Sequence, residues 1–153
     1  MGLAVVKKDI DYIRATLDPE AVHTLLQKCD EEFVPSLSQT MNLKQYAQKL
    51  SDFAQFVIAL DKGSAAGFVA YYLNDEGHFI YVPLIWVSSE DQRNGIGQQL
   101  IAQLSELSLM GYSSIRLEVL KSNTGACHFY LKEDFKMAED RNSKWLMSKD
   151  ISK

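Results

Sequence analysis

The feature that most constrains the fold of this chain is a glycine-containing turn between two hydrophobic segments. Residues 92–97, Gln-Arg-Asn-Gly-Ile-Gly, separate a strongly apolar run at 79–87 from an amphipathic run at 100–109. This order predicts a strand that enters a helix through a tight turn. Gly95 and Gly97 have no Cβ atom, so the backbone can approach an anion closely while the free N–H groups of the helix start point at it. The turn therefore predicts a binding site for a diphosphate.

The residues around the turn add a more specific pattern. The turn fits Q/R-x-x-G-x-G/A and follows Ile-Trp-Val-Ser at 85–88; Ile-Arg-Leu-Glu-Val at 115–119 comes later, followed by Asn-x-x-Ala-x-x-Phe-Tyr at 123–130. In order and spacing these elements resemble the GNAT superfamily of acyl-CoA N-acyltransferases over about residues 68–135. One departure is Asp134-Phe135, where the family has Gly-Phe.

Hydrophobic periodicity predicts one mixed α/β domain over residues 1–153. The expected strands are 3–6 with 10–14, 56–60, 67–73, 78–87, 114–120, 135–139 and 144–148, and the expected helices follow Asp18, Asn42, Gly95 and Asn123, the third ending at Met110 and Gly111. Residues 35–40 are expected to be a polar connection. The result is a mostly antiparallel sheet of six or seven strands with helices on both faces. This layout coincides with the GNAT fold, and the resemblance implies that strands 78–87 and 114–120 splay apart to admit the pantetheine arm.

The resemblance also implies a site for the co-substrate acetyl-CoA. The backbone of the strand before the turn would pair with the pantetheine amides, and the turn would hold the pyrophosphate. The residues assigned to coenzyme binding are Ile85, Trp86, Val87, Gln92, Arg93, Asn94, Gly95, Ile96, Gly97, Gln98, Asn123 and Tyr130. Arg93 can equally be an exposed loop cation, and helix capping alone would account for Asn123.

Acyl transfer to an amine needs a group that accepts the ammonium proton and a group that protonates the departing thiolate. By resemblance Tyr130 lies near the acyl-CoA sulfur, and a phenol is protonated at neutral pH, so Tyr130 is the expected acid while Phe129 packs. Glu76, His78 and Glu118 are the candidate bases, because they occupy the strands that flank the expected cleft. A solvated turn explains Glu76 equally well, and Glu118 can simply alternate out of the core.

Composition narrows the classes of partner. The net charge is −4, and residues 1–77 carry the acidic excess, without the clustered Lys and Arg that nucleic acid requires. The chain has no apolar run of the roughly 18 residues that a membrane span needs and no secretory signal, so we expect a cytoplasmic protein. Cys29 and Cys127 are far apart in sequence and form no metal-ligand pattern. We therefore expect reduced thiols and no metal site.

The resemblance implies an acetyl-CoA-dependent N-acetyltransferase in which a primary amine attacks the thioester directly. It also implies that residues 18–53 choose the acceptor, which we expect to be a small amine of the amino sugar, amino acid or polyamine class, with Glu31, Glu32 and Tyr46 as candidate positions. The acidic excess favours a cationic acceptor, although a solvated acidic surface explains it too. The same fold allows a non-catalytic acyl-CoA sensor or a protein N-terminal or lysine acetyltransferase, and the sequence leaves a homodimer open.

Overall fold

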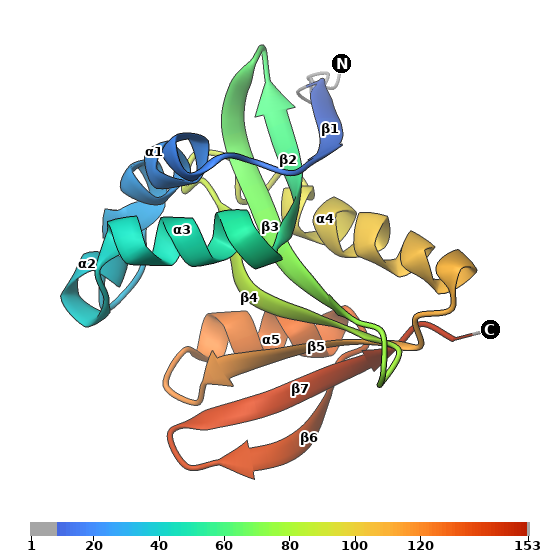
Figure 1. The fold of residues 1–153 in the computed structure, drawn as a ribbon. Coiled ribbons are helices and arrows are strands. Elements are labelled where there is room, and N and C mark those ends of the chain that lie inside the picture. Colours follow the sequence, from blue (N-terminus) through green and yellow to red (C-terminus); the bar gives the residue numbers. More distant parts are fainter. Residues whose placement is uncertain (1–8, 153) are drawn as a thin grey trace, which may run out of the picture.

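A computed structural model describes residues 9–152 of the chain. Within these residues seven strands form one sheet in the order β1-β2-β3-β4-β5-β7-β6 (Figure 1). The strands are β1 (Ile10–Ala15), β2 (Gln55–Asp61), β3 (Ser64–Asn74), β4 (Phe79–Val87), β5 (Ser114–Leu120), β6 (Lys136–Arg141) and β7 (Lys144–Asp150). β4 and β5 pair in parallel, and the other neighbours pair antiparallel. The predicted mixed sheet is confirmed; the expected strand at residues 3–6 lies outside the described residues.

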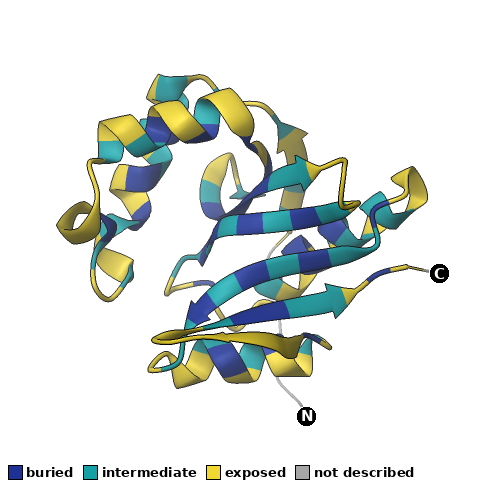
Figure 2. Cartoon of the chain, turned by 60° about the horizontal axis from the view of Figure 1, so that its bottom comes forward, coloured by how far each residue is buried: buried dark blue, intermediate teal, exposed yellow. Residues whose placement is uncertain are grey.

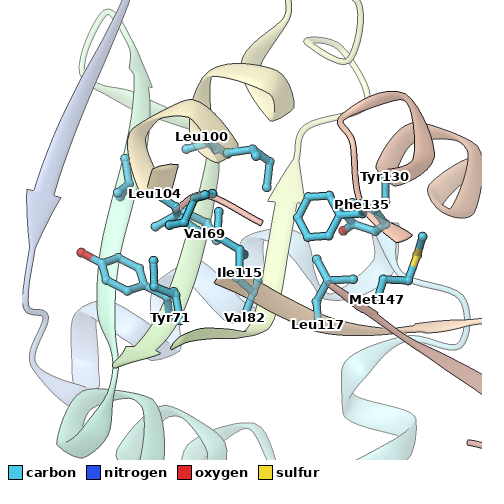
Figure 3. Packing of buried hydrophobic residues seen from close by; sticks show 14 of the residues in the cluster. Val69, Tyr71, Val82, Leu100, Leu104, Ile115, Leu117, Tyr130, Phe135 and Met147 are labelled. Carbon is cyan, nitrogen blue, oxygen red and sulfur yellow. The ribbon is translucent and has the colours of Figure 1, made fainter. Parts of the chain in front are cut away.

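Helices cover both faces of the sheet, each over its own core. On one face lie α1 (Pro19–Cys29), the 3₁₀ turn η1 (Asp30–Glu32), α2 (Leu37–Thr40) and α3 (Leu43–Phe53); on the other lie α4 (Ile96–Ser105), η2 (Glu106–Met110) and α5 (Thr124–Lys132). Leu26, Leu50 and Phe68 belong to the first core. Leu100, Tyr130 and Phe135 belong to the second (Figure 3). Burial of these apolar side chains is what holds the helices on the sheet.

The helix starts follow the sequence closely, and two other features do not. The Asp18, Asn42 and Asn123 side chains each accept a hydrogen bond from a backbone N–H group three residues on, as N-caps do. The connection after η1 contains the short helix α2, which is too brief to show a helical period. The α-helix predicted to reach residue 110 ends at Ser105 and continues as the 3₁₀ turn η2, because residues 109 and 110 find no core and stay exposed.

The sheet opens between its two parallel strands. The pairing of β4 with β5 runs from Phe79 with Ser114 to Val82 with Leu117 and ends there. Beyond this point the two strands diverge (Figure 1). The splay predicted between the fourth and fifth strands is confirmed, and within residues 9–152 no strand pairs with the second half of β4 on that side.

A bulge in β4 lies where the opening begins. Ala70 pairs with Leu84 but Tyr72 pairs with Tyr81, so two residues of β4 face one of β3. As a result the even-numbered side chains change sides: Val82 packs in the core under α4 and α5, whereas Leu84 packs in the core under α1 and α3. Pro83 is the residue at the bulge, a position where a missing backbone donor is tolerated.

Candidate functional site

The opening between β4 and β5 holds a cavity of about 910 Å³. Its walls are parts of residues 32–41, residues 82–85 of β4, residues 117–120 of β5, and Ser122, Asn123, Ala126, Tyr130 and Lys144. The volume lies within the range of sites for small molecules and cofactors. Because the wall includes an unpaired stretch of β4, an extended ligand with amide groups could add to the sheet there.

The three β4 residues assigned to the coenzyme differ in what they present. Ile85 lines the cavity. Trp86 turns its side chain into the opposite core, where its ring lies 6.0 Å from that of Phe68, and its Nε1 has no hydrogen-bond partner among the described residues. The Val87 side chain packs against the core under α4 and α5. For Trp86 and Val87, therefore, only the backbone is available for pairing with a ligand.

The glycine turn leads directly into α4. Gly95 is the N-cap residue, in the left-handed conformation with φ 73° and ψ 17°, and no side chain caps the helix. A Cβ atom at Gly95 would meet no atom of the described residues within 4 Å, so the space beside this glycine is open. Ile96 buries its side chain completely, and Gln98 is exposed. The helix start therefore offers free backbone donors to an anion.

Gly97 has a packing role in addition to the role that the sequence predicted. A Cβ atom there would come within 3.0 Å of Phe129 Cζ, on α5. The absence of a side chain at Gly97 allows α5 to pack against the start of α4. Close approach of a phosphate was the expected reason, and the structure adds a packing requirement that the sequence does not reveal.

A buried carboxylate organises the turn, and sequence reasoning missed it. Asp91 is 5% exposed and accepts hydrogen bonds from Ser88 Oγ at 2.6 Å and from Asn94 Nδ2 at 3.3 Å. Its carbonyl also accepts from the Asn94 backbone N–H group. Gln92 and Arg93 are exposed, and Gln92 Nε2 lies 3.5 Å from the Val87 carbonyl oxygen. Asn94 therefore helps to shape the turn through Asp91.

Tyr130 lies where α5 meets the cavity. It is 7% exposed, and its ring centroid lies 5.3 Å from those of Phe129 and Phe135 (Figure 3). Burial raises the pKa of the Tyr130 phenol well above its ordinary value. The phenol is therefore protonated at neutral pH and can donate a proton. Asn123 also lines the cavity while its side chain caps α5 through the Ala126 N–H group.

The three candidate bases lie at different distances from the opening. Glu118 lines the cavity, accepts a hydrogen bond from Arg141 Nη1 at 3.2 Å and lies 3.4 Å from the Tyr81 hydroxyl. Glu76 and His78 lie in the turn before β4, and neither lines the cavity. The His78 carbonyl accepts from the backbone N–H of residue 113, so that end of β4 is closed by the sheet. Among the three, Glu118 is the carboxylate that shares a cavity with Tyr130.

The three residues expected to select the acceptor lie in different surroundings. Glu32 lines the cavity, and its carboxylate accepts a hydrogen bond of 2.7 Å from the Ser89 backbone N–H group. Glu31 is exposed. Tyr46 packs against the core under α1 and α3, and burial raises the pKa of its phenol. Glu32, which lies between α1 and α2, is thus hydrogen-bonded to the segment that leads into the glycine turn.

Two further observations concern metals and membranes. Within residues 9–152 no group of three or more His, Cys, Asp or Glu side chains is arranged to hold a metal ion. None of the helices in the described part of the chain is long and apolar enough to span a membrane.

A family model matches most of the chain, and proteins of known structure share its fold. The model of the acetyltransferase (GNAT) family matches residues 20–135. Among solved structures, a GNAT-family acetyltransferase from Staphylococcus aureus has a TM-score of 0.74 and 12% identity, covering 94% of this chain and 100% of its own. The PaiA N-acetyltransferase from Thermoplasma acidophilum, solved with coenzyme A, has a TM-score of 0.73 and 17% identity, covering 92% and 99%. The ribosomal-protein-S18-alanine N-acetyltransferase of Escherichia coli has a TM-score of 0.70 and 21% identity, covering 94% and 96%. No curated protein matches the sequence.

Proposed function

Because the chain belongs to the GNAT family of acetyltransferases, we propose that it transfers an acetyl group from acetyl-CoA to the primary amine of a small acceptor. The observation that carries this proposal is the cavity in the splay, which brings the unpaired part of β4, Tyr130 and Glu118 to one space. The free backbone donors at Gly95 support pyrophosphate binding at one end of the same strand.

In the proposed reaction Glu118 accepts a proton from the bound ammonium group, directly or through a water molecule. The free amine attacks the thioester carbonyl and forms the C–N bond. The nitrogen of the tetrahedral intermediate then loses its second proton to solvent, to which Glu118 also passes the proton it accepted, and the carbon–sulfur bond breaks. Tyr130 donates its phenolic proton to the departing thiolate, and solvent returns a proton to Tyr130. The products are the N-acetylated acceptor and coenzyme A, and no covalent enzyme intermediate is needed.

The charges near the cavity support a cationic amine as acceptor. Glu32 and Glu118 both line the cavity, with Lys144 as a basic residue of the lining. Arg141 binds Glu118 and also Glu139, so three carboxylates stand against two basic side chains, Lys144 and Arg141, and this excess of negative charge favours a positively charged ligand. We infer an amino sugar, amino acid or polyamine, which carries such a charge before it reacts.

The test combines a binding measurement with an activity panel. Acetyl-CoA should raise the melting temperature of the protein, since a ligand that binds the native state stabilises it. Thiol release should then be measured with amino sugars, amino acids, polyamines and peptides. Stabilisation by acetyl-CoA without turnover of any amine would indicate the acyl-CoA sensor, and turnover of peptides alone would indicate a protein acetyltransferase.

A further inference from the structure

Arg141 lies at the end of β6, and its guanidinium binds one carboxylate on each side of β7. Its Nη1 donates to Glu118 on β5 and its Nη2 donates to Glu139 on β6, each at 3.2 Å. The register explains this arrangement, because Leu146 of β7 pairs with Glu118 on one side and with Glu139 on the other. The guanidinium therefore connects a cavity-lining carboxylate to an edge strand that is otherwise exposed (Figure 2).

A second contact reaches Glu118 from β4. The Tyr81 hydroxyl lies 3.4 Å from Glu118 Oε1, whereas Arg141 binds Oε2. Burial and the neighbouring carboxylate raise the pKa of Tyr81, so this phenol is a donor. At 3.4 Å the contact is longer than an ordinary O–H···O hydrogen bond, and Arg141 is the stronger partner.

Resting on the proposed function with Glu118 as base, we propose that Arg141 is a positioning residue that fixes the Glu118 carboxylate in the cavity, assisted by Tyr81. A base must meet the ammonium proton in a narrow range of geometry, and a free glutamate side chain samples several rotamers. The planar fork of Arg141 binds one oxygen and restricts those rotamers. Lone pairs of the carboxylate remain free to accept the proton.

The charge balance of this cluster fits the same role. Two carboxylates, Glu118 and Glu139, share one guanidinium, so the cluster keeps a net negative charge. An incoming ammonium group is therefore attracted rather than repelled. Hydrogen bonds to both carboxylates raise the pKa of Arg141, which keeps the guanidinium charged while it holds Glu118.

A purely structural role for Arg141 would be to stabilise the position of β6 relative to β5. The chain offers a matched control for that role, because Lys121, which follows β5, forms an ion pair of 2.5 Å with Asp140 of β6. This pair connects the same region of the sheet without contacting Glu118. Lys121→Gln removes only an ion pair that holds β6 in place, whereas Arg141→Gln removes such an ion pair and also the contact that positions Glu118.

The experiment compares Arg141→Gln, Arg141→Lys, Tyr81→Phe and Lys121→Gln, each in the parent and in the Glu118→Gln background. Thiol release with the best amine of the panel gives kcat/KM, and calorimetry gives acetyl-CoA affinity. Arg141→Gln should lower kcat/KM about 10- to 100-fold, and Tyr81→Phe should lower it less. Arg141→Lys should recover only part of the loss, because lysine keeps the charge but lacks the planar fork, and Lys121→Gln should match the parent. In the Glu118→Gln background Arg141→Gln should have no further effect, because it acts through Glu118.

The outcomes separate the two proposals. The positioning role is wrong if Arg141→Gln changes kcat/KM no more than Lys121→Gln does. It is also wrong if Arg141→Gln lowers kcat/KM by the same factor in the Glu118→Gln background as in the parent. In both cases the acetyltransferase assignment stands. If Glu118→Gln keeps full activity, the base assignment and the positioning role both fail. If the parent binds acetyl-CoA but releases no thiol with any amine, the proposed function fails and this inference with it. Melting temperatures establish that each variant is folded.

Discussion

Phe129 on α5 lies so close to Gly97 on α4 that a Cβ atom at residue 97 would come within 3.0 Å of Phe129 Cζ. The turn that is proposed to bind the coenzyme and the helix that carries Tyr130 are thus packed together at this point. A change at residue 97 should therefore act on stability as well as on binding.

Gly97→Val should lower the free energy of unfolding by about 1–3 kcal/mol, because its branched side chain must displace Phe129. Denaturant unfolding of the single variants and of Gly97→Val combined with Phe129→Leu measures the effect. The smaller leucine leaves room, so the double variant should lose less stability than the sum of the two single variants. Additive losses would show that the contact with Phe129 is not the cause.

Gly95 should behave differently, because a side chain there meets open space. Its φ of 73° strains a β-branched residue, whereas asparagine tolerates the left-handed region. Gly95→Asn should therefore keep the parent melting temperature, and Gly95→Val should lower it. Both should weaken acetyl-CoA binding by about tenfold, or about 1.4 kcal/mol, since the side chain occupies the space before the N–H groups. Unchanged affinity in both variants would contradict pyrophosphate binding at this turn.

Asp91→Ala should weaken acetyl-CoA binding without removing any group that touches the ligand. The carboxylate holds Ser88 and Asn94 around the turn, and hydrogen bonds to a charged group contribute about 1.5–3 kcal/mol each. Calorimetric titration should show a larger dissociation constant, and melting should show a lower stability. Glu90→Ala is the control, because Glu90 is the exposed neighbour of Asp91.

The strands and the helix starts could be predicted from the sequence because period, capping residues and turn chemistry are local signals, whereas the splay was implied by the resemblance to the GNAT family. The bulge at Pro83 does not, since it requires the register between β3 and β4. This bulge decides that Leu84 and Trp86 face the core under α1 and α3.

The residues of the candidate site also fall into those that the sequence could name and those that it could not. The resemblance named Tyr130 as the candidate acid, but the sequence left Glu76, His78 and Glu118 open as candidate bases. That choice depends on which end of β4 opens, which is a property of the pairing with β5. Asp91 and Arg141 gave no local signal at all, because their roles depend on burial and on a contact across β7.

Glu32→Gln should raise the Michaelis constant for a cationic acceptor by about fivefold, because it removes one negative charge from the cavity wall. The glutamine oxygen can still accept the hydrogen bond from the Ser89 N–H group, so the segment leading into the turn should be preserved. Glu31→Gln is the matched control: it removes the same charge from an exposed neighbour outside the cavity lining. Equal effects of both variants, or no response with any cationic amine, would argue against electrostatic choice of acceptor at Glu32.

Tyr130→Phe should lower kcat by about 100-fold while leaving acetyl-CoA affinity nearly unchanged, because it removes the proton donor and keeps the ring contacts with Phe129 and Phe135.

Because the pKa of Tyr130 is raised, the direction of two further pH effects can be predicted, one on the reaction rate and one on stability. The rate of the parent should rise with pH as the amine or its base loses a proton, and it should not fall near pH 10, where an ordinary phenol ionises. Stability should change in the opposite sense: the contribution from Tyr130 is complete below the unfolded-state pKa near 10 and is lost as pH rises from there towards the higher folded-state pKa. Tyr130→Phe should therefore lose less stability than the parent above pH 10, although Tyr46, whose pKa burial also raises, still contributes in both proteins. Rate profiles and denaturant unfolding of the two proteins from pH 6 to pH 11 make the comparison. A variant that retains the parent turnover and the parent sensitivity to alkali would remove Tyr130 from the mechanism.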